Sequence, residues 1–568
     1  MTKETIAIVG MGCRLPGAGS VEELWGLLSS GTDATSFTPP SRYDAELLYS
    51  KRPERGKVIS QRSGYIEDVG LFDAEYFGMS EGEANALDPQ QRLLMMVAVE
   101  AFEDAGISLD DLAGTRSGVY IGNMHQDYWS LLAKRGLEHI SPSAIYNYLS
   151  ILSGRLAYTF DLRGPSISLD TACSSSLVTV HLACQALRTG EAEIALAGGV
   201  NLKLTPDEDV LLSQVRMLAP DGRCKFGDAS ANGFAPSDGV GLVVLKTLSK
   251  AQQDGDRIRG LLLGSVTSND GALSGSLLAP STEAHAQMLR WAYEDAGVDP
   301  ADVSFVEAHG TGTPMIDPVE FQALSQVMGA GRPMDRPLLV GSIKSNIGHT
   351  EGAAGVASLI KTVLCLENRC VVPSLHFKNP NPKIPWDDLP LKVPTDIEYL
   401  PETHRLVAGI SAQGISSANT HLVVGEAPES TEAPVPPSTN VEYLFRISAK
   451  CESALIGLAR KYLSYLEKHG EAHKYSILDI CFSSCRRRAR QEVGYEVLVS
   501  THGGLTQALR GYLKEGGRPA VKHDGSFEFP SEARYVPLPS YAWQLKHYWL
   551  PKEDDEAAVI PPELAGPS

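Results

Sequence analysis

The chain has 568 residues, a formal net charge of −19, and 43% hydrophobic against 21% charged residues. These values are typical of a globular protein with a substantial core, and the length predicts two to four structural units rather than one. The negative charge argues against nucleic acid or an anionic membrane surface as the main partner.

Two further whole-chain properties narrow the class of protein. No stretch approaches the roughly 18 unbroken apolar residues of a membrane span, and the apolar run at the start is too short for a signal peptide. The nine cysteines are scattered without a paired zinc-ligand spacing. We therefore expect reduced thiols, no metal site and a cytoplasmic location.

The first predicted element is a buried strand at 5–11, which enters the turn Gly10-Met11-Gly12. A glycine turn after a strand suggests a dinucleotide-binding loop. The third glycine is absent at the required spacing, however, and Pro16 opposes the helix that would hold a phosphate. NAD binding at this turn is therefore rejected.

Strands and helices alternate over the next 420 or so residues. Predicted strands lie at 117–121, 166–169, 193–200, 240–246, 259–265, 303–308, 339–343, 371–374 and 421–425. Predicted helices lie at 21–35, 88–105, 283–296, 318–328 and 353–367. This alternation predicts an α/β protein with a layered, mostly buried sheet.

The composition changes after residue 427. Residues 428–440 are rich in Pro, Ser and Thr and are predicted to be an extended linker. Strands at 442–447 and 495–500, with helices at 452–468, 475–488 and 504–514, predict a small α+β domain over 441–525. The aromatic segment 526–550 is expected to pack back on the body, and the acidic, Pro-rich segment 551–568 to be disordered.

One turn carries a candidate nucleophile. The predicted strand at 166–169 leads through small polar residues to Cys173, and the apolar residues that follow cover nearly every helical direction, which predicts a buried helix. A cysteine near a helix N-terminus is favoured as a thiolate. The alternative is a buried cysteine that only packs, the usual role of a lone Cys.

Two histidines follow predicted strands in the same way. His309 stands in the loop 307–313 and His349 in the loop 344–352, both rich in Gly and Thr. A lone histidine is more often structural, but ligands favour strand ends in α/β proteins. A cysteine with two imidazoles suits thioester formation followed by carbanion attack, in which the rings hold a carbonyl oxygen or move a proton. This chemistry requires neither a metal nor a redox cofactor.

Three motifs together resemble the β-ketoacyl synthase (ketosynthase) domain of modular type I polyketide synthases. They are DTACSSS at 170–176, EAHGTGT at 307–313 and KSNIGHTEGAAG at 344–355. The resemblance covers roughly 4–427, so the domain is assigned to 1–427. It implies a duplicated thiolase-like fold in α-β-α-β-α layers and a homodimer. It also implies decarboxylative Claisen condensation between an acyl chain and a malonyl-type extender on acyl carrier protein. The carrier protein, rather than this chain, would hold the phosphopantetheine cofactor.

The resemblance also implies a role for each site residue. Cys173 would take the acyl chain, His309 and His349 would serve decarboxylation and stabilise the enolate, and Lys344 would support the histidine pair. The backbone N–H groups of Cys173 and Ile415 would form the oxyanion hole. The residues expected to contact phosphopantetheine or substrate are Thr311, Thr313, Asn346 and Asn419.

The remainder resembles the flanks of such synthases. Residues 441–525 are similar to the linker domain that follows a ketosynthase, and 538–550 to the linker that follows an acyltransferase. No Gly-x-Ser-x-Gly motif and no room for an acyltransferase lie between them. We expect an acyltransferase in trans, or one that has been removed from this chain. The basic residues at 486–488 and 490 predict a solvated face, with a carrier-protein contact as the alternative.

The loop expected to close over the nucleophile departs from the family pattern. The usual Phe-Gly-Phe-Gly-Gly-Thr-Asn is replaced at 413–419, where the gate residues are Gln413, Gly414, Ile415, Ser416 and Ser417. A reshaped acyl pocket explains this most simply. The alternatives are chain branching, cyclisation or acyl transfer without elongation, and, from a different class, a non-catalytic scaffold protein.

Overall fold

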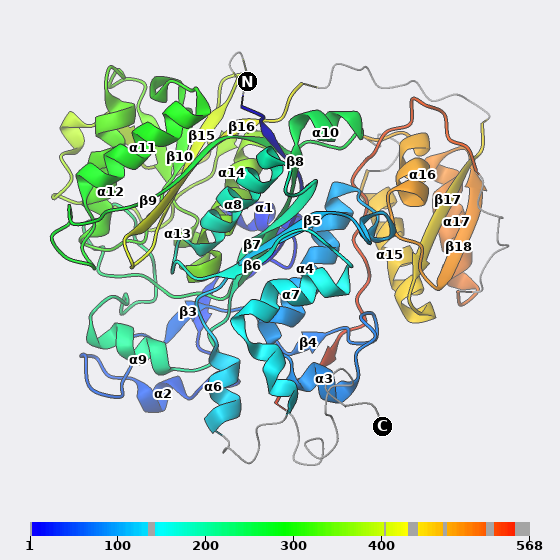
Figure 1. Cartoon of the computed structure of the whole chain (residues 1–568), viewed down its shortest axis with the longest axis horizontal. Coiled ribbons are helices and arrows are strands. Elements are labelled where there is room, and N and C mark those ends of the chain that lie inside the picture. Colours follow the sequence, from blue (N-terminus) through cyan, green and yellow to red (C-terminus); the bar gives the residue numbers. More distant parts are fainter. Residues whose placement is uncertain are drawn as a thin grey trace.

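The computed structural model describes residues 3–134, 142–402, 405–429, 441–469, 474–517 and 527–550. Within these residues, one eleven-stranded sheet runs through the body in the order β13-β11-β10-β15-β16-β9-β1-β8-β7-β5-β6. Figure 1 shows this twisted sheet with helices on its faces, and a smaller unit beside it.

The sheet consists of two halves with the same internal order. The first half contains β1 (Ile6–Arg14), β5 (Ser117–Gly122), β6 (Ser166–Leu169), β7 (Ile194–Asn201) and β8 (Gly239–Thr247). The second contains β9 (Gly260–Asn269), β10 (Phe305–Glu307), β11 (Leu338–Gly341), β15 (Val407–Gln413) and β16 (Ala418–Glu426), with β13 (Leu391–Lys392) added at its edge. In each half two antiparallel pairings are followed by two parallel ones. The halves join where β1 pairs with β9, so the fold is a duplication.

Helices form three layers around these strands. α4 (Pro89–Ala105) and α7 (Leu149–Thr159) cover the first half, and α11 (Thr282–Ala296) with α12 (Ile316–Leu324) covers the second. Between the halves lie α8 (Ser175–Thr189) and α14 (Ala354–Glu367), which pack on each other and on strands of both halves. Their residues are buried on nearly all sides, which confirms the sequence prediction for the helix after Cys173. The result is the five-layered arrangement expected of the thiolase-like fold.

The remaining elements are short or peripheral. The strands are β2 (Thr35–Phe37), β3 (Arg62–Gly64), β4 (Leu71–Phe72), β12 (Cys370–Val371) and β14 (Glu398–Tyr399). The helices are α1 (Val21–Ser29), α2 (Ala45–Leu48), α3 (Glu81–Ala86), α5 (Leu109–Leu112), α6 (Asp127–Lys134), α9 (Asp207–Gln214), α10 (Leu248–Gln253) and α13 (Lys344–Ile347). No helix in the described ranges combines the length and apolar character needed to cross a lipid bilayer.

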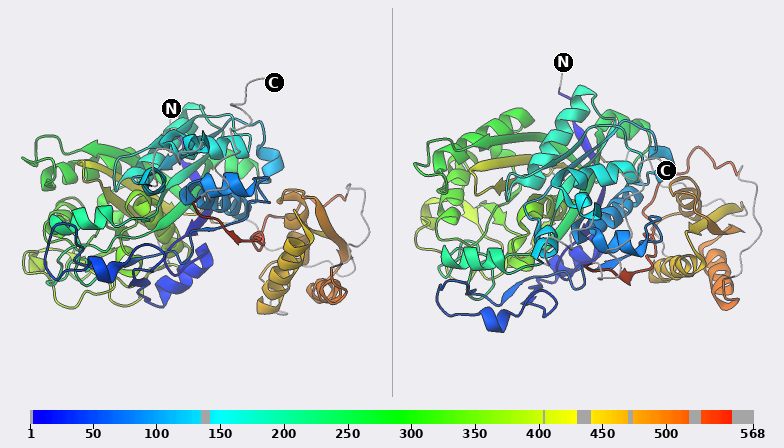
Figure 2. Two further views of the ribbon diagram at one scale, coloured as in Figure 1. Left: turned by 90° about the horizontal axis from the view of Figure 1, so that it is seen from below. Right: turned by 60° about the horizontal axis from the view of Figure 1, so that its bottom comes forward.

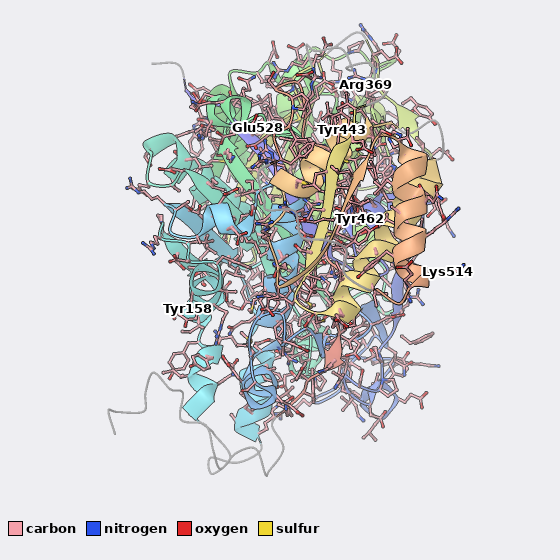
Figure 3. The ribbon with its side chains drawn as sticks, turned by 90° about the vertical axis from the view of Figure 1, so that its right-hand side faces the viewer. Tyr158, Arg369, Tyr443, Tyr462, Lys514 and Glu528 are labelled. Atoms are coloured by element: carbon pink, nitrogen blue, oxygen red, sulfur yellow. The ribbon has the colours of Figure 1, made fainter. Side chains whose placement is uncertain are left out.

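The smaller unit pairs β17 (Tyr443–Ala449) with β18 (Val493–Val499) and packs three helices against them. These are α15 (Glu452–His469), α16 (Ile477–Arg486) and α17 (His502–Lys514). The unit projects from one end of the body in both views of Figure 2, and Tyr443 and Tyr462 mark it in Figure 3. Its predicted strands and helices are all present, with bounds shifted by one to two residues.

The chain then returns to the body, as the aromatic segment predicts. Tyr541 donates its N–H to Glu103 (2.9 Å), Trp543 donates its ring N–H to Glu100 (2.8 Å), and β19 (Lys546–His547) pairs with β4. The basic residues at the end of α16 are not a simple solvated face. Arg488 donates to the carbonyl oxygen of Glu103 (2.7 Å), so it helps to hold the small unit on the body.

Some sequence predictions differ from the structure. The strand pattern misses β15, because several of its residues are small. The core around β15 leaves no room for larger ones: a Cβ on Gly409 would collide with Tyr293 and His421. The helix predicted at 318–328 is α12 followed by a π-helical turn at Ser325–Gly329. Most of the predicted linker, the end of the predicted small domain and the predicted disordered tail lie outside the described residues, at 430–440, 518–526 and 551–568.

Candidate active site

Cys173 stands on a strained turn between β6 and α8. The preceding residue, Ala172, has φ of 57°, a left-handed conformation that costs a non-glycine residue of the order of 1 kcal/mol. The N–H of Ala172 donates to the Asp170 carboxylate (2.7 Å), and its carbonyl accepts from the Ser175 hydroxyl (2.6 Å). Ser174 also donates to the carbonyl of Thr171 (2.8 Å). The Asp and Ser side chains of the motif therefore hold the turn that presents the cysteine.

The thiol of Cys173 is not a thiolate at rest. Its side chain keeps some exposure, yet burial raises its pKa to about 12, and the nearby carboxylate of Glu351 raises the pKa further. The charge of Lys344 acts in the opposite direction but is outweighed. This differs from the sequence expectation, which considered only the helix N-terminus.

The loop that carries His309 follows β10 and is held from α12. The buried carboxylate of Glu320 accepts the N–H groups of His309 (2.7 Å) and Gly310 (2.9 Å). Asp317 accepts those of Gly312 (3.1 Å) and Thr313 (3.3 Å) in the same way. Four backbone donors of a buried loop are thus paired by two carboxylates, which fixes the position of the imidazole.

The loop that carries His349 follows β11, so it occupies the place in the second half that the Cys173 turn occupies in the first. The N–H of His349 donates to the carbonyl of Ala235 (2.7 Å). Gly348, just before it, has φ of 80° and lies so close to Ala235 that a Cβ would meet its carbonyl oxygen at 2.9 Å. Only glycine suits this approach.

The two imidazoles are neutral and share one tautomer. The N–H of Gln413 donates to Nδ1 of His309 (3.3 Å), and the N–H of Glu351 donates to Nδ1 of His349 (3.2 Å). Because Nδ1 accepts in both rings, the ring hydrogen is on Nε2. Burial, followed by the charge of Lys344, lowers both pKa values, that of His349 to about 3, so neither ring gains a second proton at neutral pH. Both rings are therefore hydrogen-bond donors at Nε2.

These groups meet at one cavity of about 110 Å³. Its wall contains Cys173, His309 and His349, and the ring centroids of the two histidines lie 5.4 Å apart. The apolar part of the wall is formed by Met124, Leu212, Met217, Phe234, Leu277, Leu278, Ala279, Pro280, Ile316 and Ile415. An apolar cavity with a few converging polar groups is the usual form of a small-molecule site.

The other predicted site residues fall in two groups. Thr311, Thr313 and Asn419 line the cavity, and the hydroxyls of Thr311 and Thr313 are 3.2 Å apart. Lys344 is buried behind the histidines and acts on them through its charge. Asn346 is fully buried with its amide donating to the carbonyl of Thr32 (3.2 Å), and it is not part of the described cavity wall. Its position does not support contact with phosphopantetheine.

The gate loop 413–417 is pressed onto the nucleophile turn. A Cβ on Gly414 would collide with the carbonyl oxygen of Thr171. Ser417 has φ of 63°, and its hydroxyl donates to the carbonyl of Leu277 (2.9 Å) in the neighbouring loop. Asn419 donates to Asp270 at the base of that loop (2.6 Å). The gate is therefore tied to a second loop of the cavity wall.

One cluster beside the cavity contains metal-ligating residue types, namely His125, Glu208 and Glu351. His125 Nε2 lies 2.8 Å from a carboxylate oxygen of each glutamate, and these contacts raise its pKa to about 10. The contacts make the cluster an ion-pair network. The sequence gives no motif for it, because His125 comes from a loop, Glu208 from α9 and Glu351 from a 3-10 turn.

Comparison with known proteins agrees with this geometry. Residues 3–251 match the beta-ketoacyl synthase N-terminal domain, 259–378 its C-terminal domain and 380–496 the ketoacyl-synthetase C-terminal extension. The ketosynthase from module 6 of the bacillaene synthase of Bacillus subtilis 168 is 32% identical, with a TM-score of 0.87 over 96% of this chain and 100% of that one. The oxazolomycin ketosynthase domain OzmH KS7 of Streptomyces albus JA3453 is 31% identical, with a TM-score of 0.88 over 96% and 99% of the two chains.

Curated relatives are longer proteins. Polyketide synthase GfsB of Streptomyces halstedii is 45% identical over 91% of this chain and 10% of its own length. Erythronolide synthase EryA2 of Saccharopolyspora erythraea is 41% identical over 91% of this chain and 14% of its own length. The chain thus spans less than a third of the curated relatives that it matches. By its sequence matches, its thiolase-like fold and its cysteine–histidine site, the chain belongs to the β-ketoacyl synthase family, as a ketosynthase of the polyketide synthase type.

Proposed function

We propose that this ketosynthase catalyses decarboxylative Claisen condensation between an acyl chain on Cys173 and a malonyl-type extender on acyl carrier protein. One observation carries the proposal: a cysteine and two imidazole Nε2–H donors surround the same small cavity. A nucleophile and a pair of oxyanion donors are what an acyl acceptor and an enolate need.

In the first half-reaction the sulfur of Cys173 attacks an incoming acyl thioester. The bond between the acyl carbon and the donor sulfur breaks, and the thiol proton leaves with the departing pantetheine thiol. Cys173 and Ile415 both line the cavity, and their backbone N–H groups are proposed to receive the oxyanion that forms. Neither histidine has a free ring lone pair for this proton, since Nδ1 already accepts a backbone N–H.

In the second half-reaction the malonyl group loses CO₂, and the electron pair of the broken C–C bond passes into an enolate. The Nε2–H groups of His309 and His349 stabilise its oxygen. The enolate carbon then attacks the acyl carbon on Cys173, whose sulfur leaves as a thiolate and takes one proton from the solvent. Neutral imidazoles suit this step. They donate the Nε2 hydrogen bond to the enolate oxygen, and they carry no extra proton that the malonyl carboxylate could take.

The substrate is proposed to arrive on the phosphopantetheine arm of a carrier protein. Thr311, Thr313 and Asn419 supply hydroxyl and amide groups at the cavity wall, where the amides of such an arm need partners. The cofactor would therefore belong to the partner protein. The nine cysteines are free thiols, which supports a reducing compartment such as the cytoplasm.

We also propose an acyltransferase that acts in trans. The small unit ends with α17 at Lys514, and the segment that docks on the body is described from residue 527. Between residues 517 and 527 there is no room for a further domain, so loading of the extender needs another chain or another part of a longer one.

A homodimer is proposed on the edge strand β6. Its Ile167 is 39% exposed, and Tyr158 of the adjacent α7 is 79% exposed. An uncovered sheet edge with apolar neighbours favours pairing with a second copy. In Figure 3 Tyr158 lies at the opposite margin from Lys514 of the small unit, so the two surfaces do not compete.

Sedimentation should give twice the chain mass of 61.1 kDa. Ile167→Lys should give monomers and Ile397→Lys should not, whereas monomeric wild-type protein would contradict the proposal.

Because the gate loop is altered, a variant reaction is the second candidate function. One experiment distinguishes it from condensation with elongation. Wild-type protein is incubated with an acyl thioester, then with malonyl carrier protein, and the masses of both proteins are followed. We expect an acyl adduct on Cys173 that disappears as a β-ketoacyl carrier protein forms. His309→Ala and His349→Ala should still accept the acyl group but fail to elongate it. Transfer to the carrier protein without decarboxylation would support the variant reaction, and no adduct on Cys173 would support a scaffold.

A further inference from the structure

The amide of Gln413 is an unsatisfied polar group in the wall of the active-site cavity. The side chain is 6% exposed, and its Nε2 is buried without a hydrogen-bond partner. Of the described residues that form this wall, Gln413 alone has a buried side-chain atom in that condition. A buried donor without an acceptor costs about 1–3 kcal/mol, which a well-packed apolar residue would avoid.

The other polar residues of the wall already have partners. Glu351 accepts from His125 and Asn201, Asp270 accepts from Asn419, and the hydroxyls of Thr311 and Thr313 lie against each other. None of them turns toward Gln413 in the described contacts. A ligand that enters the cavity can supply the acceptor that the Gln413 amide lacks.

The position of Gln413 says which part of a ligand it meets. Its own backbone N–H donates to Nδ1 of His309 (3.3 Å), and the next residue, Gly414, is pressed against the carbonyl of Thr171, two residues before the nucleophile. The backbone that carries the amide is thus flanked by His309 and the cysteine turn, and the side chain lines the same cavity as both. An acyl chain on Cys173 passes this point with its first carbons, rather than with its far end.

The chemistry of condensation determines which acyl chains carry an oxygen close to the thioester. Each round leaves a carbonyl on the third carbon of the growing chain, and that oxygen remains as a ketone or hydroxyl unless it is removed. An oxygen on the third carbon accepts a hydrogen bond from an amide N–H, and a hydroxyl can also donate to the amide oxygen. A fully reduced chain offers neither.

We propose that Gln413 is a specificity-determining residue, whose amide binds an oxygen on the third carbon of the acyl chain and so selects β-oxygenated over fully reduced acyl thioesters. A site built to hydrogen-bond a substrate oxygen discriminates against the analogue without it, because its own polar group is then left unpaired. The inference rests on the proposed acylation of Cys173.

The test compares three small thioesters of equal chain length: butanoyl-, (3R)-3-hydroxybutanoyl- and (3S)-3-hydroxybutanoyl-N-acetylcysteamine. The rate of Cys173 acylation is measured by mass spectrometry without extender, so any effect on decarboxylation is absent. We expect wild-type protein to take one hydroxy enantiomer about five- to tenfold faster than butanoyl, the value of one hydrogen bond.

The variants assign this preference to the amide. Gln413→Leu keeps the size and the backbone N–H but removes the amide, and the ratio should fall to within about twofold. Gln252→Leu, the same change at an exposed glutamine of α10 outside the described cavity wall, should keep the wild-type ratio. If Gln413→Leu does not fold, Gln413→Asn withdraws the amide by one methylene and should lower the ratio in the same direction.

Two results would overturn the inference: equal acylation of all three thioesters by the wild type, or an unchanged preference in the Gln413 variants. Failure of the wild type to be acylated by any thioester would instead refute the proposed function. The two failures are therefore distinguishable.

Discussion

Cys173 illustrates how one residue combines opposing influences. Its place before α8 favours a thiolate, whereas burial and the carboxylate of Glu351 raise its pKa to about 12. The raised pKa means that the enzyme rests with a neutral thiol, and that only a small thiolate fraction is available at neutral pH.

We predict the pH profile of alkylation from this value. Below a pKa near 12, the thiolate fraction grows about tenfold for each pH unit. The rate of iodoacetamide reaction at Cys173, followed by peptide mass spectrometry, should therefore rise steadily from about pH 7 to about pH 9. A plateau near neutral pH would show that the thiol is activated at rest.

Glu351→Gln tests the second cause of that raised pKa. Removing the negative charge should lower the Cys173 pKa and speed its alkylation about threefold in mildly alkaline buffer. The amide oxygen can still accept hydrogen bonds from His125 and Asn201, so the surroundings are preserved. Unchanged alkylation would mean that Glu351 does not act on the thiol.

The sequence predicts which residues react, but it does not predict their tautomers or the orientation of their side chains. Three motifs with small polar residues after predicted strands are enough to find Cys173, His309 and His349. The tautomers cannot be predicted, because they depend on backbone N–H groups of Gln413 and Glu351 that only the fold brings to the rings. For Asn346 the motif likewise does not show which way the side chain turns, and the fold places its amide against the carbonyl of Thr32.

Among the secondary-structure elements, strand patterns predict nearly the whole sheet. The exceptions are the two-residue edge strand β13 and the central strand β15, whose residues are small and which leads directly into the gate loop. The sequence shows that this loop lacks both aromatics and the two later glycines of the family pattern. It does not show that Ser417, in place of a glycine, ties the loop to the carbonyl of Leu277.

We predict that Ser417→Ala loosens the gate loop. The substitution removes a partly buried hydrogen bond worth about 1 kcal/mol while the strained backbone conformation remains. Hydrogen–deuterium exchange over 413–419 should become faster. Ser416→Ala is the matched control, because its exposed side chain should leave the exchange unchanged. Equal exchange in the two variants would remove the role assigned to the Ser417 hydroxyl.

For the whole molecule, the docking of the small unit follows from buried charge pairing. Arg488 donates to the carbonyl oxygens of Glu103 (2.7 Å) and Leu538 (3.2 Å), and its guanidinium faces the Glu103 carboxylate at 3.9 Å. The sequence suggests a solvated basic face, because its pattern cannot show which arginines meet a second surface.

Arg488→Met should destabilise the protein by about 2 kcal/mol, because it removes two hydrogen bonds to carbonyl oxygens and leaves the partly buried Glu103 carboxylate without its cation. Arg490, whose side chain is 58% exposed, provides the control, and Arg490→Met should change the free energy of unfolding by less than about 1 kcal/mol. Urea denaturation measures both values. A similar small effect for the two variants would show that Arg488 does not hold the unit in place.

The most direct test of the central claim is the mass of the product on the carrier protein. Acyl-loaded wild-type protein is mixed with malonyl carrier protein, and the carrier is analysed intact. The account predicts a carrier whose malonyl group has lost CO₂ and gained the acyl group, with Cys173 returned to its free thiol. A carrier that bears the unextended acyl group, or the malonyl group alone, would contradict it.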